Sequence, residues 1–501
     1  MRRAFLFGWA LLLVCSSLEA QTKIRILSAE VTDIVKQKNG SRAYYLRGNV
    51  GLQQDEAIMT CDSAILIQPD NEFKAFKNVR IVQADTTIIT GKTLEYDGDS
   101  RTFTMNQDVE LSTPSSLLQT KQLFYDRNRS TAYYTSRSIL HRKNLELTSD
   151  NGIYNTEIDV VNLKGEVVAI DSAYSLFTDT LLYYPAEDLF RFVGPSTLLR
   201  DSTTILCRQG EYNSEKAQLN LSKRATISSP GSFIRSDSLS YNLNGESGQL
   251  FGRALVADSA EGLVLESAFI DYVREPNFVD AFSPVYYRQR LDSDTLYARG
   301  DTLYLRTDTS GFRTVDLRDS TKFFSDNFQG RSTYFNYDER FDALTLFPKP
   351  LMWSKKSQFA CDSAILKFEE DILDSLFLIG NTTIVSQTDD SIHFDQAAGK
   401  LLEGQFMNNE LSSLELKGNA QNITHSISDA GQIEGINKTS CAFITITFSD
   451  GDVNKVNAHK GVEASYAPWS TATTEMKDLP GCTPRFEKRT KFNETRLPTT
   501  L

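Results

Sequence analysis

Three cysteines occupy equivalent positions in the sequence, and thiols can serve as nucleophiles, metal ligands or disulfide partners. Cys61, Cys207 and Cys361 lie 146 and 154 residues apart, at a position that other copies of the same pattern fill with serine or threonine. In a stacked array this spacing separates them by tens of ångströms, whereas a disulfide needs Cα atoms within about 7 Å. The pattern predicts small buried residues at packed corners. For Cys441 and Cys482 a disulfide stays open as an alternative.

Histidines and recurring aspartates are the other residues that could support chemistry. The four histidines, His141, His393, His425 and His459, show no spacing typical of a metal site. Aspartates recur beside the cysteine position at residues 62, 150, 179, 237 and 362. Calcium loops need several ligands in one short stretch and acid catalysis needs one special pair, so hydrogen bonding to turn backbone explains these aspartates better. We expect no enzyme, no catalytic residue, no metal site and no cofactor.

The elements that must position these residues come from an internal repeat. Residues 61–66 and 361–366 are both Cys-Asp-Ser-Ala-Ile-Leu. Between them a polar or small residue is followed three positions later by an apolar or small one, and usually five positions later by tyrosine. Copies begin at residues 61, 91, 120, 149, 178, 207, 236, 267, 299, 332 and 361, which are 29 to 33 residues apart. This regularity indicates a structural period of about 29 residues.

A second signal runs in phase with the first and marks turns. The pairs are Gly48-Asn49, Lys77-Asn78, Gln107-Asp108, Gly165-Glu166, Gly252-Arg253, Gly380-Asn381 and Gly418-Asn419. Glycine and asparagine tolerate the positive φ of a tight turn, and a short apolar alternation follows each pair. The predicted unit is therefore a turn, a short strand, a second turn and a longer strand.

Alternation of apolar and polar residues dominates both strands, and Thr, Val, Ile, Tyr and Phe are abundant. The predicted fold is all-β, an elongated repeat array of about 29-residue units. Apolar residues of the longer strands share one face and those of the short strands face them across an apolar trough or sandwich. The positions predicted to line this interior are Val50, Leu52, Val79, Ile81, Val109 and Leu111 on one wall and Leu94, Tyr96, Leu123, Tyr125, Leu181, Tyr183, Leu239 and Tyr241 on the other.

The two ends of the sequence differ from the repeats. Residues 1–20 are typical of a signal peptide, with Arg2 and Arg3, an apolar run and a small residue, Ala20, at the expected cleavage site. Lipidation at Cys15 is the less favoured alternative, because Val14 precedes it. The domains predicted after the signal are a regular array over 21–275, less regular repeats with insertions over 276–350, a regular array over 351–465 and a basic, proline-containing tail over 466–501. The tail is interpreted as a solvated terminus, with a docking segment as the alternative.

Charge limits the classes of partner. The formal net charge of −12 becomes −13 once the signal is removed, which disfavours a general nucleic-acid-binding protein. An acidic chain would have to recognise an anionic lipid through its apolar interior.

The phased motifs resemble those of the OstA-like family, which includes the periplasmic lipopolysaccharide-transport protein LptA and the amino-terminal domain of the outer-membrane translocon LptD. The matching stretches include residues 47–50, 60–64, 91–97, 236–241 and 379–381, and the likeness extends over about residues 25–465. The resemblance implies a β-jellyroll, or β-taco, whose apolar interior holds the acyl chains of lipid A. The fourteen interior residues above would then contact lipid.

The resemblance also implies a place and partners. The protein would lie in the periplasm, peripheral to the inner or outer membrane. It would pair edge strands with LptC-like and LptD-like modules to bridge the membranes, with self-association as a further option. The chain is far longer than a minimal LptA and lacks a carboxy-terminal barrel pattern. Two alternatives remain open: a structural or adhesive surface β-solenoid without lipid, and a carbohydrate-active β-helix enzyme.

Overall fold

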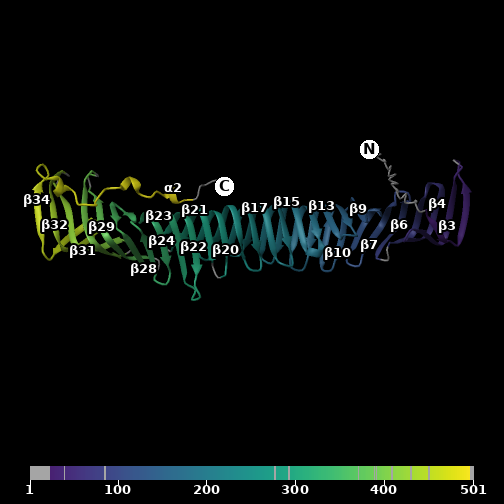
Figure 1. Ribbon diagram of the computed structural model, residues 1–501, viewed down its shortest axis with the longest axis horizontal. Helices are drawn as coiled ribbons and strands as arrows, with labels where there is room; N and C mark the ends of the chain where they lie inside the picture. Colours follow the sequence, from purple (N-terminus) through teal and green to yellow (C-terminus); the bar gives the residue numbers. More distant parts are fainter. Residues whose placement is uncertain are drawn as a thin grey trace, which may run out of the picture. The chain divides into compact units, whose positions relative to one another are not determined.

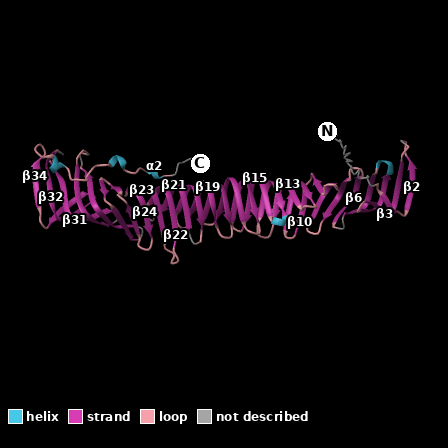
Figure 2. Cartoon of the chain, in the orientation of Figure 1, coloured by secondary structure: helices cyan, strands magenta, loops and turns pink. Residues whose placement is uncertain are grey.

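The computed structural model describes residues 23–496 except 39, 84–85, 276–277, 292–293, 370–371, 389, 391, 408–409, 429–431 and 450–451. The predicted signal peptide, with Cys15, lies outside these residues. The chain divides into two compact units, Met1–Asp188 and Leu189–Leu501, and strands make up most of the described part of each (Figures 1 and 2). No helix in the described part has the length and apolar character needed to cross a membrane. The all-β prediction is confirmed.

The first unit contains fourteen described strands and two short 3₁₀ helices. They are β1 (Arg25–Ser28), β2 (Val31–Lys36), β3 (Arg42–Gln54), β4 (Ala57–Ile67), η1 (Gln68–Asp70), β5 (Glu72–Gln83), β6 (Thr87–Asp97), β7 (Thr102–Ser112), β8 (Leu117–Asp126), β9 (Thr131–Tyr134), β10 (Ser138–Arg142), β11 (Leu145–Ser149), β12 (Asn151–Asn155), β13 (Val160–Ile170), β14 (Ser175–Tyr184) and η2 (Pro185–Glu187). Successive long strands such as β4, β5, β6 and β7 pair antiparallel.

The second unit continues the same arrangement and adds short helices near its end. Its elements are β15 (Leu189–Arg200), β16 (Thr203–Asn213), β17 (Gln218–Ser229), β18 (Ser232–Asn242), β19 (Ser247–Asp258), β20 (Leu263–Val273), β21 (Phe278–Arg290), β22 (Thr295–Thr307), β23 (Arg313–Phe324), β24 (Gln329–Asp338), β25 (Ala343–Phe347), β26 (Leu351–Ser354), β27 (Ser357–Ala360), β28 (Ser363–Glu369), β29 (Ile372–Gln387), β30 (Phe394–Met407), β31 (Glu410–Ile427), β32 (Ile433–Ser449), β33 (Asp452–His459), β34 (Glu463–Pro468), α1 (Thr474–Lys477), η3 (Phe486–Lys488) and α2 (Phe492–Thr495).

The predicted turn pairs have positive φ but lie inside strands. Gly48 and Asn49 have φ of 74° and 42°, and they interrupt β3 as a bulge between Arg47 and Val50. The other six predicted pairs also have positive φ at both residues. The prediction of a corner between a short and a longer strand is therefore wrong. A bulge bends the strand and restores pairing after one disrupted step, so a unit consists of two bent strands joined by hairpin turns.

Each bent strand contributes to two sheets that meet at the bulges. We call the half-strands that carry Tyr96, Tyr125 and Tyr154 the tyrosine sheet and the other halves the opposite sheet. The ends of the two sheets farthest from the bulges also meet, because Gln54 Nε2 of the opposite sheet donates to the Gly98 carbonyl beyond the tyrosine sheet at 2.8 Å. We call this line of contact the mouth. Inward-facing side chains of both sheets form the core between bulges and mouth.

Three of the five recurring aspartates bind side chains at the bulges. Asp62 accepts hydrogen bonds from the Asn78 amide at 3.0 and 3.1 Å, and Asp362 accepts one from the Asn381 amide at 2.8 Å. Asp237 pairs with Arg253 in the same way. These carboxylates bind side chains of the bulge residues, whereas the sequence suggested backbone N–H partners. Their role at the bend is structural.

One unit departs from the predicted face assignment. The motif copy at residues 299–304 predicts Thr302 and Tyr304 as interior residues. Leu303 and Leu305 are buried instead, and Tyr304 lies on the outer face beneath the Arg318 guanidinium, 4.8 Å from its ring centre. A shift of one residue exchanges the two faces of a strand, and the longer spacing around this copy hides that shift in the sequence.

Candidate functional site

The fourteen residues predicted to line the interior all lie in the core. Each is at most 5% exposed, with Val50, Leu52, Val79, Ile81, Val109 and Leu111 in the opposite sheet and the others in the tyrosine sheet. Their contact with lipid stays a prediction. At these positions the interior is packed by the protein's own side chains, so entry of an acyl chain there requires the two sheets to separate.

Aromatic rings line the inner edge of the mouth in the first unit. Phe73, Tyr96, Phe103 and Tyr125 stack in sequence, with ring centres 5.0, 6.2 and 5.3 Å apart. They come from neighbouring strands β5 to β8, at equivalent places near the strand ends. Tyrosine suits this boundary because its ring packs in the core while its hydroxyl reaches polar partners at the mouth.

Polar contacts close the mouth at this stack. The Tyr96 hydroxyl donates to Gln54 Oε1, and Arg127 Nη1 donates to the same hydroxyl at 2.7 Å. Burial raises the pKa of Tyr96, and the neighbouring Arg127 opposes that shift. Gln54 is 1% exposed, so this bond joins two buried groups from opposite sides of the mouth. Buried polar groups need such partners, and together they form a clasp.

Other parts of the mouth carry different clasps. Arg142 pairs with Asp159 at 2.7 Å, and the Tyr154 hydroxyl donates to the same carboxylate at 3.0 Å. In the second unit, Arg200 Nη2 donates to Asn244 Oδ1 at 2.6 Å. The clasps vary in residue type along the chain, which explains why no repeated motif revealed them.

An apolar cavity opens in the second unit, where the repeats are less regular. It has a volume of about 280 Å³ and adjoins a smaller one of about 90 Å³. The residues common to both are Leu291, Leu296, Leu344 and Phe368. Phe328 and Phe406 extend the apolar lining of the smaller cavity. Ligand pockets are typically of about 300–1,000 Å³, and the two adjoining cavities together lie at the lower end of that range.

The rim of the larger cavity is charged. Arg313 Nη1 pairs with Glu261 at 3.1 Å, and the Arg313 backbone N–H donates to Glu339 Oε2 at 2.6 Å. Arg290 also lines this cavity. An apolar floor beneath a charged rim suits an amphiphile.

None of the fourteen predicted residues lines this cavity. The sequence predicts less regular repeats with insertions over residues 276–350 and does not predict a cavity there. Leu291 and Phe328 are apolar residues at hairpin turns, but Ile158, Leu243 and Phe341 also lie in turns and line neither cavity. No signal in the sequence therefore marks this cavity.

The cysteines are buried donors without a disulfide. Cys61 and Cys441 donate to the carbonyl two residues later at 3.3 and 3.2 Å, as Ser149 does at 2.9 Å. Cys441 and Cys482 are both free. Burial raises the pKa of Cys61 to about 11 and that of Cys361 to about 12, so the thiol is the form present at neutral pH.

The histidines have carboxylate or aromatic neighbours. His393 and His425 approach Asp390 and Asp395 at 2.6 and 2.9 Å, and both rings pack against Trp469. Within the described ranges, no group of three or more His, Cys, Asp or Glu side chains is placed to hold a metal ion.

Comparison with protein-family models gives one match, to the family described as OstA-like protein, over residues 21–161 and 147–237. Residues 21–237 are OstA-like. The OstA-like region includes β1 to β17 and the first half of β18, and it contains all the predicted interior residues except Leu239 and Tyr241. The apolar cavity lies after the OstA-like region in the sequence. No curated protein matches the chain.

Proposed function

We propose that this protein is exported to the periplasm and carries lipopolysaccharide toward the outer membrane, with lipid A acyl chains held between its two sheets. The OstA-like region supports this class of function. The observation that carries the proposal for this chain is the apolar cavity with its charged rim in the second unit. We propose no catalytic role.

The energetics favour an acyl chain in such a space. Burial of apolar surface contributes about 25 cal/mol per Å². Leu344 presents such surface in both cavities and Phe328 in the smaller one, while Arg290 and Arg313 lie among the charged groups at the rim. The acyl chains would lie on the apolar floor, and the phosphorylated sugars would face the rim and water. Glu261 and Glu339 lie at the rim beside the two arginines, so recognition of an anionic lipid would rest mainly on the apolar floor.

Bridging would use the first and last strands. Among the described residues, β1 and β2 pair with β3 alone, and Ile34 on β2 is 58% exposed. At the other end of the strand order, β33 and β34 both pair with β32. Unpaired strand edges accept further strands. We propose LptC-like and LptD-like modules as the partners, with pairing between copies of this chain as the alternative.

Photocrosslinking in living cells tests the proposal. A photoreactive residue at Phe368 should give lipopolysaccharide adducts, and one at Leu94 or Leu181 should give them while the sheets are separated. Phe341, which is 69% exposed in the neighbouring turn, is the matched control and should give none. The absence of adducts at all three interior positions would exclude lipid transport.

A structural spacer without lipid is the second candidate function. The observation in its favour is the closed interior at the fourteen predicted positions, together with the clasps across the mouth. Extraction of lipid from the purified mature protein separates the two candidates. Lipid in the extract supports transport, and its absence from protein purified without detergent supports the spacer.

A further inference from the structure

Residues 469–496 return along the second unit as a strap. After β34 the chain passes through α1, η3 and α2 and runs back from β32 toward β22 (Figure 1). It covers the outer face of the opposite sheet, the face turned away from the core. The strap is therefore a bound segment, and the interpretation of this tail as a solvated terminus is wrong.

Three buried glutamines hold the strap, two of them through its backbone. Gln396 Nε2 donates to the Lys477 carbonyl at 3.0 Å, and its Oε1 accepts from the Leu479 N–H at 2.8 Å. Gln358 repeats the arrangement with the Thr483 carbonyl and the Arg485 N–H, at 2.9 and 2.6 Å.

The third glutamine, Gln329, accepts from Arg489 Nε at 2.8 Å. A glutamine amide has both N–H donors and a carbonyl acceptor. Gln396 and Gln358 can therefore bind an extended backbone whatever side chains it carries.

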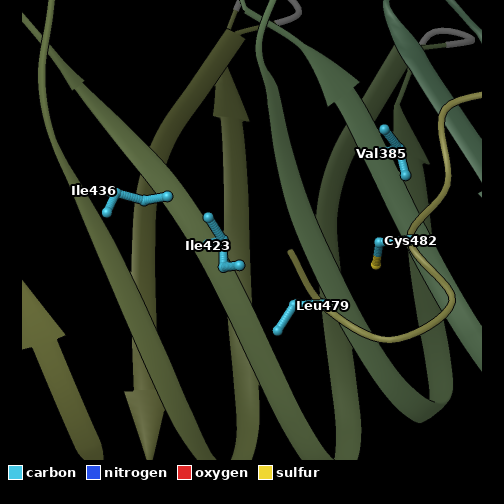
Figure 3. Close-up of a cluster of buried hydrophobic side chains, with 5 residues drawn as sticks. All are labelled: Val385, Ile423, Ile436, Leu479 and Cys482. Atoms are coloured by element: carbon cyan, nitrogen blue, oxygen red, sulfur yellow. The ribbon is translucent and has the colours of Figure 1, made fainter. Parts of the chain in front are cut away.

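Apolar contacts seal the first part of the strap. Leu479 and Cys482 pack on Val385, Ile423 and Ile436 of the outer face, and all five are buried (Figure 3). In the strands of the regular units, by contrast, outward-facing positions are mostly polar or half-exposed. The apolar residues on this outer face are therefore buried by the strap.

Arg489 connects the strap to the apolar cavity. Its Nη1 donates to the Lys355 carbonyl at 2.7 Å, while its Nε binds Gln329. Gln329 Nε2 in turn donates to the carbonyls of Ser325 and Asp326 at 2.6 and 3.1 Å. Ser325, Phe328 and Ser354 line the smaller cavity. One guanidinium therefore ties together two hairpin turns, 325–328 and 354–356, that both carry lining residues of the smaller cavity.

The end of the strap is anchored beside the same turns. Glu494 pairs with Lys322 at 2.7 Å and with Arg331 at 3.1 Å. Phe492 packs against Tyr297 and Phe324, with ring centres 4.9 and 5.5 Å away. Tyr297 follows Leu296, whose side chain lines the cavity. The anchor thus holds the strand that carries the cavity wall.

We infer that the strap is a clamp on the opening of the apolar cavity. While the strap is bound, Arg489 fixes the two turns and keeps the opening narrow. When the strap is released, the turns separate and the cavity widens to admit or release an apolar chain. The identity of the apolar chain as a lipid acyl chain rests on the proposed function. The contacts by which Arg489 holds the two turns do not depend on it.

The test compares full-length mature protein with Arg489→Ala and with Lys488→Ala, an exposed neighbour, as the matched control. Loss of hydrogen bonds from a charged donor should raise hydrogen–deuterium exchange in turns 325–328 and 354–356 on the order of tenfold. It should speed dissociation of cis-parinaric acid by a similar factor. The Lys488→Ala variant should match the wild type in both measurements.

Two results would overturn the clamp: unchanged exchange in both turns in Arg489→Ala, or faster exchange with no change in probe dissociation. Glu494→Ala, which frees the end of the strap, is the second variant if Arg489→Ala fails to fold, and thermal unfolding checks both. If cis-parinaric acid binds none of the proteins, the proposed lipid ligand fails, while exchange in the turns still decides whether the strap holds them.

Discussion

Cysteine, serine and threonine replace one another at one position of the repeat because each supplies a small donor beside the bend. Cys61, Thr120 and Ser149 all donate to the carbonyl two residues later. That carbonyl belongs to a residue beside the break in ladder pairing at the bulge, as Ser63 does in β4, and a buried donor next to such a break needs an acceptor. The substitution pattern was visible in the sequence, but the hydrogen bond behind it needed the bend to be located.

Protonation of one carboxylate should loosen the strap. Burial raises the pKa of Glu494, but hydrogen bonds from Lys322 and the Lys491 N–H and the charge of Arg331 outweigh it, so the net shift is below the ordinary 4.5. A lowered pKa means that the carboxylate stabilises the folded strap above pH about 4.5 and loses this effect as the pH falls through the lowered value.

We expect exchange in residues 486–496, corrected for intrinsic rates, to be slow at pH about 6 and to rise below pH about 4. Glu494→Gln should show raised exchange at both values and little further change on acidification. A wild-type strap that stays equally protected throughout this range would contradict the assignment of the switch to Glu494.

At the scale of elements, the alternation of side chains predicted the strands well, and the positive φ of the paired residues was also predicted. The sequence could not distinguish a turn between strands from a bulge within one, because both use Gly-Asn pairs. The distinction depends on the partner strand, where Asp362 binds Asn381 across the bend. Whether a Gly-Asn pair forms a turn or a bulge therefore depends on strand pairing, which a local sequence pattern does not contain.

A methyl group at one bulge glycine should be costly. Gly380 has φ of 76°, and an added Cβ would overlap the Asp362 carboxylate. Gly380→Ala should lower the free energy of unfolding by about 1–3 kcal/mol, measured by urea denaturation. Gly311→Ala is the control, because Gly311 has φ of 90° and no neighbour near its added Cβ, and it should lower the free energy of unfolding by less. Equal losses would show that backbone strain alone matters at the bulge.

The candidate site was only partly predictable from these elements. The interior positions follow from alternation, so Leu94 and Tyr96 were placed in the core correctly. The clasps were not predictable, because Arg142 and Asp159 meet only once the two sheets close. The glutamines under the strap were hidden for a similar reason: Gln358 and Gln396 look like ordinary surface residues until a segment more than 80 residues away covers them.

At the scale of the whole molecule, stability in a repeat array is built from contacts between neighbouring strands. Leu402 in β30 is fully buried. Leu402→Ala should therefore lower the free energy of unfolding by about 2–5 kcal/mol. Hydrogen–deuterium exchange should rise in β29, β30 and β31 and stay unchanged in β16, β17 and β18. A uniform rise through the second unit would mean that the unit unfolds as one cooperative body.

The bent strand also constrains how such a chain can gain or lose length. Every bent strand supplies one segment to each sheet and runs opposite to its neighbours, so deleting one such strand would reverse the direction of all that follow and leave a connection to cross the mouth. Removal or duplication of a whole hairpin preserves the direction of the following strands and keeps their connections from crossing the mouth. Genes for such proteins should therefore change in steps of about 29 codons, and the identical hexapeptides at residues 61–66 and 361–366 fit descent by such steps.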